Sequence, residues 1–352
     1  MRKVSTASSV RHPHYGRGME PLRIGILGAS RIAPNALFDP ARHTGDQLVA
    51  MAARDRSRAE KYAAEHGIGR VGDDYRSLIT DSEVEVIYNP LANGLHGPWN
   101  IEAMKAGKHV LSEKPSASTA DEARRVLDVQ AETGVCFMEA FHYRYHPVMD
   151  RMVELASSGE LGAISHVDIV MGFPLTRPDD PRWNFELAGG SLMDVGCYAV
   201  HAIRTLSTAL GGSPEVVEAS AVPHEADDRV DAELSADVSV AEGVTGHFHS
   251  SFLLPEMTFT LLLEGSEGTA LAHNFCQPAL DNRITITRGD DVSVEKHGDR
   301  SSYTYQLEAF GRQVREGASI HSDATDALEQ ATVMDACYAA AGLPLRPETT
   351  LR

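Results

Sequence analysis

Cysteine is scarce in this 352-residue chain, and its four cysteines stand far apart. They are Cys136, Cys197, Cys276 and Cys337, and they form neither a C-x-x-C pair nor a cluster with histidine. Structural zinc sites and disulfide-linked small domains need closer groupings than these. The spacing therefore predicts four free thiols in a reducing compartment, and no metal site.

Positive charge is also in short supply. The chain has 32 lysine and arginine residues against 50 aspartate and glutamate residues, which gives a net charge of -18 at pH 7. Such a balance repels the phosphate groups of nucleic acids and of anionic lipids. We therefore expect neither a nucleic acid nor a membrane surface as a partner.

Long apolar runs are missing from the start of the chain. The first 20 residues are polar and mildly basic, so they form neither a signal peptide nor a membrane-spanning helix. We expect residues 1–20 to be a disordered tail, with Met19 as an alternative start, ahead of a first strand that begins at Leu22. The predicted location is the cytoplasm.

The patterns that are present indicate two domains. A chain of this length with 42% hydrophobic residues can form two cores of ordinary size. Apolar strands in LRIGILGAS, QLVAMAARD, EVEVIYNP and KHVLSEKP alternate with helix-like stretches, which is typical of a parallel sheet. Longer alternating segments such as VTGHFHSSF and MTFTLLLEG predict an antiparallel sheet later on. We expect an α/β Rossmann domain at residues 21–143 and an α+β domain at residues 144–352.

Helix signals accompany this division. Thr119 and Glu122 have capping-box spacing, and Gly107 suits the position just after a helix. Near the C-terminus, apolar side chains recur every three or four residues, which predicts two amphipathic helices. Their buried stripes are Tyr303, Leu307, Phe310 and Val314, and then Ala327, Ala331, Met334 and Tyr338.

A glycine turn follows the first predicted strand. Gly28, Ser30 and Ala33 take the three small positions of a G-x-G-x-x-G/A motif, with serine in place of the middle glycine. Small residues there let backbone N–H groups approach a pyrophosphate at the start of a helix. We expect this turn to bind a dinucleotide, although ordinary tight-turn packing produces the same pattern. The contacting residues are then Gly28, Ser30, Arg31 and Ile32.

The end of the second predicted strand indicates which nucleotide is bound. NAD enzymes place an acidic residue against the ribose 2′-hydroxyl there, and NADP enzymes place an arginine near the 2′-phosphate. Here the strand ends in Ala53 and Arg54, and a guanidinium pairs with a phosphate through two parallel hydrogen bonds. The sequence favours NADP(H). NAD(H) is the alternative, because Arg54 can be a solvated loop charge and Asp55 can bind the ribose 2′-hydroxyl.

A second group of motifs carries a family resemblance. AGKHVLSEKP places Glu113 and Lys114 just after a strand, where open parallel sheets bind ligands. IGILGASRIA, ANGLH, MEAFHYRYHP and GGSLMDVGCY accompany it in order. From Leu22 to about Pro347 the chain resembles the glucose-fructose oxidoreductase, inositol dehydrogenase and MocA-like family. Its nearest likeness there is the branch of dimeric dihydrodiol dehydrogenase and NADP-dependent D-xylose dehydrogenase.

The resemblance implies a Rossmann domain followed by a mostly antiparallel, open-faced sheet. Family members often pair through the open face, so we expect a homodimer or homotetramer. By the same resemblance, Glu113 and Lys114 should contact the cofactor. Lys114 should also lie beside the reacting oxygen, where a cation stabilises developing alkoxide charge.

The remaining catalytic residues are also implied by the resemblance. Asp194 and Tyr198 are four residues apart, which places both on one face of a helix. We expect Tyr198 to transfer the proton, Lys114 to tune the pKa of Tyr198, and Asp194 to bind a substrate hydroxyl. A solvated lysine and a tyrosine that caps the core through its hydroxyl are the alternatives.

Four further residues are weaker candidates. Asn93 and His96 match a P-N-x-x-H element that lines the nicotinamide in the family, with Ala92 in place of the proline. Arg182 and Trp183 lie in a loop that the family folds over the substrate. A histidine with a purely structural role, and an arginine stacked on an indole at the surface, are the alternatives.

Together these features predict hydride transfer between nicotinamide and a carbinol or carbonyl carbon of a sugar, polyol or cyclic diol, without a metal. The family implies three alternatives: reduction of a keto-sugar, including a nucleotide-linked one, NAD-assisted cleavage of glycosides, and nucleotide-binding regulation without turnover. The presence of both Lys114 and Tyr198 favours turnover. The substrate stays open, because the loops at residues 173–187 and 223–230 contain no recognisable motif.

Overall fold

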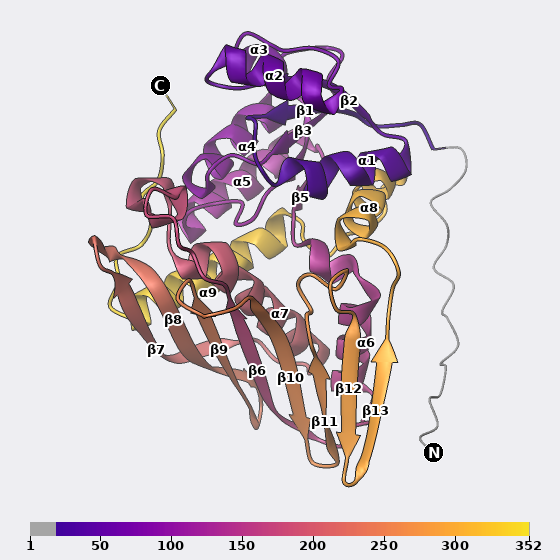
Figure 1. Ribbon diagram of the computed structural model, residues 1–352, viewed down its shortest axis with the longest axis vertical. Coiled ribbons are helices and arrows are strands. Elements are labelled where there is room, and N and C mark those ends of the chain that lie inside the picture. Colours follow the sequence, from indigo (N-terminus) through magenta and orange to yellow (C-terminus); the bar gives the residue numbers. More distant parts are fainter. Residues whose placement is uncertain (1–18, 352) are drawn as a thin grey trace.

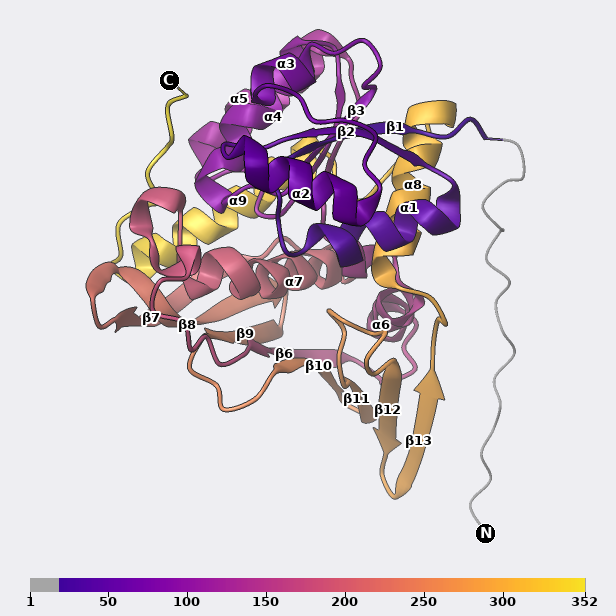
Figure 2. The same ribbon diagram turned by 45° about the horizontal axis from the view of Figure 1, so that its top comes forward.

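A computed structural model describes residues 19–351 of the chain (Figure 1). The tail expected at residues 1–20 therefore lies, up to residue 18, outside the described residues. Two sheets dominate the molecule, and helices lie between and around them (Figure 2). No helix within residues 19–351 is long and apolar enough to cross a membrane.

The first sheet consists of five parallel strands, as the alternating pattern predicts. They are β1 (Arg23–Leu27), β2 (Gln47–Ala52), β3 (Val86–Asn89), β4 (His109–Ser112) and β5 (Phe137–Glu139). Their order across the sheet is β2-β1-β3-β4-β5. The connection therefore changes direction at β1, and sheets of this kind bind ligands beyond the carboxyl ends of the strands beside that point. The predicted Rossmann domain is confirmed.

Helices cover both faces of this sheet (Figure 2). Val86 and Tyr88 pack into one buried cluster, and Ile87 between them packs into another, as the alternation of side chains along a strand requires. The helical segments are η1 (Pro34–Phe38), α1 (Asp39–Thr44), α2 (Arg56–His66), α3 (Tyr75–Ile79), η2 (Asn93–Leu95), α4 (His96–Lys105) and α5 (Ala120–Thr133).

The predicted helix ends are found where expected, with one difference. Gly107 follows α4 in the left-handed region, at φ +78°. The Thr119 hydroxyl accepts a hydrogen bond from the Glu122 N–H at 3.2 Å, which caps α5. The Glu122 carboxylate, however, accepts from the N–H of Ser118 at 2.6 Å rather than from that of Thr119. Only half of the expected capping box is therefore present.

The second sheet has eight strands in the order β13-β12-β11-β10-β6-β9-β8-β7. Its members are β6 (Ile164–Gly172), β7 (Glu215–His224), β8 (Asp227–Ala241), β9 (Val244–Ser251), β10 (Thr258–Gly265), β11 (Gly268–Ala272), β12 (Arg283–Arg288) and β13 (Asp291–Lys296). Neighbours are antiparallel except β6 and β9. The helices α6 (Pro147–Ser157) and α7 (Cys197–Ala209) lie on one side, and Figure 2 shows the other side of the described sheet without helices. The predicted open-faced sheet is confirmed.

The two predicted C-terminal helices connect the sheets. They are α8 (Ser302–Glu316) and α9 (Ala324–Ala340). Leu307 and Phe310 of α8 pack in one core with β1, and Ala327 of α9 packs in the core on the opposite face of the first sheet. Tyr338 at the far end of α9 packs against the second sheet. The boundary between residues 143 and 144 stays a prediction, and helices from beyond it share cores with the first sheet.

Candidate active site

The glycine turn has the backbone shape of a phosphate cradle. Gly28 lies in the left-handed region at φ +84°, and a Cβ there would stand 2.9 Å from Leu91 Cδ2. Glycine is therefore required on two grounds. Within residues 19–351, the backbone N–H groups of Ser30, Arg31 and Ile32 have no hydrogen-bond acceptor, and they directly precede the helical turn η1. Free N–H groups at the start of a helix fit the pyrophosphate of a dinucleotide.

Two side chains of α2 hold this turn in place through hydrogen bonds to its carbonyl groups. Arg58 donates a hydrogen bond to the Ala29 carbonyl at 2.7 Å, and Tyr62 donates to the Ser30 carbonyl at 2.6 Å. Sequence reasoning missed Arg58. Its signal is a second arginine close after Arg54, in the first turn of α2, and the charges of both arginines act on Tyr75.

Arg54 and Asp55 differ sharply in their surroundings. Arg54 is exposed, and its charge acts on the hydroxyl of Tyr75, the side chain that lies near Gly28. Asp55 is the N-cap of α2, and its Oδ1 accepts from the Arg58 N–H at 3.0 Å and from the Ser57 hydroxyl at 2.8 Å. Those hydrogen bonds lower the pKa of Asp55. The arginine is thus available to a ligand, whereas the aspartate caps the helix.

His96 is buried, which fits the structural role that the sequence leaves open beside a role at the nicotinamide. Its side chain is 1% exposed. Its two ring nitrogens lie 2.7 Å from the Pro115 carbonyl and 2.8 Å from the Leu91 carbonyl, and burial lowers its pKa to about 4. His96 therefore braces the turns after β3 and β4 instead of facing an open cleft. Asn93 in η2 donates to the Ala188 carbonyl at 3.1 Å, which ties that turn to the second domain.

Lys114 and Asp194 meet, as the resemblance implies. Lys114 follows β4, and Asp194 lies in η6 (Leu192–Gly196), a π-helical turn that leads into α7. The Lys114 ammonium donates to the Asp194 carbonyl at 2.6 Å and to Asp194 Oδ1 at 3.2 Å. Burial alone lowers the pKa of Lys114, but the nearby negative charges raise it further than burial lowers it. The ammonium therefore stays protonated at neutral pH.

Arg182 completes the surroundings of Asp194. It lies in η4 (Pro181–Trp183), and its Nε donates to Asp194 Oδ2 at 2.6 Å. Burial by itself raises the pKa of Asp194, whereas the charges of Lys114 and Arg182 lower it to about 2. Asp194 is therefore a buried carboxylate held between two cations.

The same ion pairs extend to the glycine turn through Asp180. Its carboxylate is 1% exposed and pairs with Arg182 at 3.3 Å, with Arg31 at 3.5 Å, and also with Arg177. Sequence reasoning missed Asp180, because its partners are two neighbours in the loop and a residue 149 positions away. The loop expected over the substrate is thus tied to the turn expected to bind the nucleotide.

Glu113 and Trp183 have partners of their own. Tyr88 of β3 donates to Glu113 Oε1 at 2.8 Å, and burial raises the pKa of this carboxyl group. Trp183 stacks on His224, with ring centroids 4.2 Å apart, and its indole N–H donates to the Arg177 carbonyl at 3.1 Å. Trp183 does not stack on Arg182, so the proposed surface pair of arginine and indole is absent from the described residues.

Tyr198 lies beside Lys114, but the contact is not the expected one. The Lys114 ammonium stands 4.9 Å from the centre of the Tyr198 ring, over its face. The hydroxyl instead lies 3.1 Å from Nε2 of His142, in the turn η3 (His142–Tyr145). Burial raises the pKa of Tyr198 well above its usual value. The expectation that Lys114 tunes the Tyr198 hydroxyl directly is not met in this geometry.

Two further aromatic residues, His142 and Tyr303, lie at the site, and sequence reasoning did not place them there. The His142 ring packs at a tilt against Tyr303 of α8, with ring centroids 3.8 Å apart. The sequence predicts Tyr303 as part of a core stripe. Burial raises the pKa of its hydroxyl well above the usual value, and the charges of Glu113 and Asp194 raise it further. The predicted helical position of Tyr303 is correct, but spacing alone does not show that Tyr303 lies beside the proposed active site.

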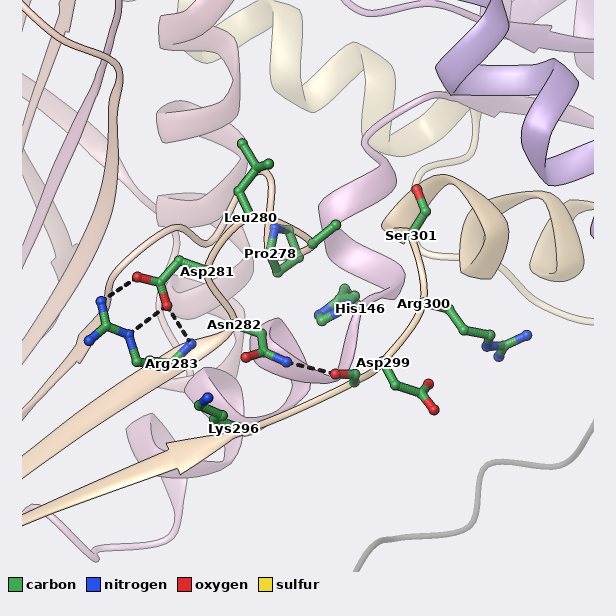
Figure 3. Close-up of a pocket in the computed structure, with 12 residues that line it drawn as sticks. His146, Pro278, Leu280, Asp281, Asn282, Arg283, Lys296, Asp299, Arg300 and Ser301 are labelled. Carbon is green, nitrogen blue, oxygen red and sulfur yellow. Dashed lines mark hydrogen bonds and ion pairs between the residues drawn. The ribbon is translucent and has the colours of Figure 1, made fainter.

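A polar pocket of about 450 Å³ lies elsewhere, between β12, β13 and the start of α8 (Figure 3). Its lining includes His146, Lys296 and Ser301 and none of the residues predicted for the active site. We place the active site by the chemistry at the carboxyl ends of β1, β3 and β4.

Both domains of the chain match known proteins. Residues 22–141 match the model of the oxidoreductase family with an NAD-binding Rossmann fold, and residues 149–271 match the GFO/IDH/MocA C-terminal domain. A D-xylose 1-dehydrogenase (NADP(+)) of Haloferax volcanii is 34% identical over 325 residues, which cover 91% of this chain and 97% of that protein. A trans-1,2-dihydrobenzene-1,2-diol dehydrogenase of Mus musculus is 33% identical over 261 residues, covering 73% and 76% of the two chains.

A solved structure has the same overall fold. It is a 3-ketoreductase from Actinomadura kijaniata in complex with NADP and TDP-benzene, with a TM-score of 0.84 and 27% identity. The match covers 91% of this chain and 98% of the reductase. Variants of that reductase with one tyrosine changed to phenylalanine or one lysine changed to alanine have also been solved.

Proposed function

The chain belongs to the Gfo/Idh/MocA family of oxidoreductases, and we propose that it transfers hydride between NADP(H) and a carbinol or carbonyl carbon of a sugar, polyol or cyclic diol. The observation that carries this proposal is the meeting of Lys114, Asp194 and Tyr198 beyond β4. Ion pairs through Arg182 and Asp180 link Asp194 to Arg31. Arg31 belongs to the turn whose free N–H groups fit a pyrophosphate. Relatives named for xylose and for a cyclic diol support the substrate class.

The bound nicotinamide supplies the hydride acceptor or donor, and the protein supplies orientation and charge. Lys114 stays cationic and lies where the negative charge of a reacting oxygen develops, so it stabilises that charge. Asp194, fixed by two cations, accepts a hydrogen bond from a neighbouring substrate hydroxyl. The Tyr198 hydroxyl exchanges a proton with the reacting oxygen, since a phenol has one proton and two acceptor positions.

Arg54 supports the choice of NADP(H). Replacing it with alanine should weaken NADPH binding by about 10- to 100-fold, because a hydrogen bond between charged groups contributes about 1.5–3 kcal/mol. Binding of NADH, which has no 2′-phosphate, should stay near the native value. Fluorescence titration of both nucleotides measures the contrast, and equal weakening of both would contradict the assignment.

Two variants of α2 serve as comparisons for that experiment. Arg58→Ala removes a cation together with its hydrogen bond to the Ala29 carbonyl of the glycine turn, so it should weaken the binding of both nucleotides. Arg56→Ala removes an exposed charge that pairs with Glu60 and Asp73, and it should change the binding of neither nucleotide.

We also propose a cytoplasmic enzyme that pairs through the open face of the second sheet. The four cysteines are free, and Figure 2 shows that one face of this sheet has no helices over it. A homodimer or homotetramer would cover that face. Light scattering during size-exclusion chromatography measures the mass, and a monomer at micromolar concentration would rule out this part of the proposal.

The function itself is tested by a substrate screen. Sugars, inositols, anhydro-sugars and cyclic diols are incubated with NADP⁺ or NAD⁺, and keto-sugars, including nucleotide-linked ones, with NADPH or NADH. The absorbance of the reduced nicotinamide reports turnover in either direction. Nucleotide binding without turnover across the panel would favour a regulator. Glycoside products without a net absorbance change would favour NAD-assisted hydrolysis.

A further inference from the structure

The proton that Tyr198 exchanges needs a route to solvent. The Tyr198 residue is 6% exposed, and its hydroxyl faces inward to Nε2 of His142 at 3.1 Å. On the opposite side of the imidazole ring, Nδ1 lies 2.8 Å from the hydroxyl of Ser302. Three side chains from α7, η3 and α8 thus form one line of hydrogen bonds. The residues that they link are 56 and 160 positions apart in the sequence.

The line ends at a buried serine whose neighbour in the sequence lines a pocket. Ser302 is 3% exposed and is the first residue of α8. The residue before it, Ser301, lines the polar pocket in Figure 3 together with His146. The line therefore runs from the proposed active site to the residue that follows a pocket-lining serine in the sequence.

Burial disfavours a charge on either of the first two groups. It raises the pKa of Tyr198 well above 10.0, and it lowers the pKa of His142 to about 3, with a further contribution from the charge of Lys114. The ionisable groups that act on Tyr198 are Cys276, Tyr303, Glu113 and Cys197, and those that act on His142 are Lys114 and His146. Tyr198 can therefore take a proton from substrate with little cost only if it releases its own at the same time.

We propose that His142 and Ser302 relay the proton of Tyr198 between the substrate and solvent. The relay rests on the proposed function of Tyr198. During oxidation, the substrate O–H bond breaks and a new O–H bond forms at Tyr198, while the original Tyr198 proton moves to His142 Nε2. The proton on Nδ1 moves to Ser302, whose own proton passes to water. The electron pair leaves the substrate with the hydride, so the relay moves one proton and creates no buried charge.

Ser302→Ala tests the outer link without touching Tyr198 or His142. It should lower kcat by about 10-fold, since general acid–base assistance contributes about 100-fold or more in full. It should leave KM and nucleotide affinity near native. Its kcat for oxidation should also rise with pH between about pH 7 and 10, because a base from solvent must then accept the proton, whereas the native profile should be flat over that range. Ser302→Thr restores a hydroxyl and should recover most of the loss.

Ser301→Ala is the matched control. Ser301 is the neighbouring serine at the N-cap of α8, and its side chain makes no capping hydrogen bond. It loses the same hydroxyl as Ser302→Ala without touching the relay, so its kcat and pH profile should be native. Thermal unfolding of all variants checks that the fold is kept.

His142→Gln separates a relay from simple positioning. An amide can still hydrogen-bond the Tyr198 hydroxyl, but it cannot accept a proton on one atom and release one from another. Its kcat should fall by about 100-fold with KM little changed. Native kcat and a native pH profile in both Ser302→Ala and His142→Gln would overturn the relay. If Tyr198→Phe is inactive in the same assay, the proposed function of Tyr198 stands even when the relay fails.

Discussion

Tyr198→Phe is expected to lower kcat by about 100-fold or more, while nicotinamide nucleotides still bind. The change removes one oxygen atom and leaves the ring, which packs on Phe141 and lies over the Lys114 ammonium. Its effect should therefore fall on proton transfer rather than on the fold. Steady-state kinetics at several pH values, with nucleotide titration by fluorescence, measure the two properties separately.

A suitable control for this variant is Tyr62→Phe. Tyr62→Phe also removes a hydroxyl hydrogen bond, a partly buried one to the Ser30 carbonyl, but at the turn proposed to bind the nucleotide. It should change nucleotide affinity more than kcat. Near-native turnover in Tyr198→Phe would remove Tyr198 from the proposed mechanism.

Lys114→Met should lower kcat/KM by about 100- to 1,000-fold, the size of effect seen when one group that stabilises an oxyanion is removed. Methionine nearly keeps the length of the side chain and removes the charge. Asp194 retains its ion pair with Arg182, so it is not left as an isolated buried charge. The loss should therefore appear in catalysis much more than in thermal stability.

Two further lysine variants make this experiment decisive. Lys105→Met makes the same chemical change at an exposed position at the end of α4 and should behave like the native enzyme. Lys114→Arg keeps the charge, but a planar guanidinium cannot take the position of a compact ammonium. It should recover only part of the activity. Native kcat/KM in Lys114→Met would contradict the proposed role of the lysine.

The ion pairs of Arg182 and Asp180 could not be predicted from local sequence patterns. Arg182 is expected from the family resemblance to contact substrate, and in the structure it also holds Asp194 in place. Asp180 joins that pair to Arg31 of the glycine turn. No local pattern predicts such pairs, because an ion pair between distant segments depends on how the second domain lies against the first.

Local sequence patterns determined much of the architecture. Apolar strands that alternate with helices specify the parallel sheet, and two stripes with helical spacing specify α8 and α9. Gly28 marks its turn because only glycine fits a positive φ next to Leu91. The motifs around Lys114 and Tyr198 identify the family. Such motifs are local, because they consist of residues that directly follow a strand or begin a helix.

Only the tertiary structure decided how these residues face one another. Sequence places Tyr198 four residues after Asp194, but packing of three separate elements turns its hydroxyl to His142 and not to Lys114. It also places the buried His96 ring between two carbonyl groups. The direction of a hydroxyl or an imidazole depends on neighbours far away in the chain. The physical reason is that hydrogen bonds of buried polar groups must be satisfied by whatever the fold brings beside them.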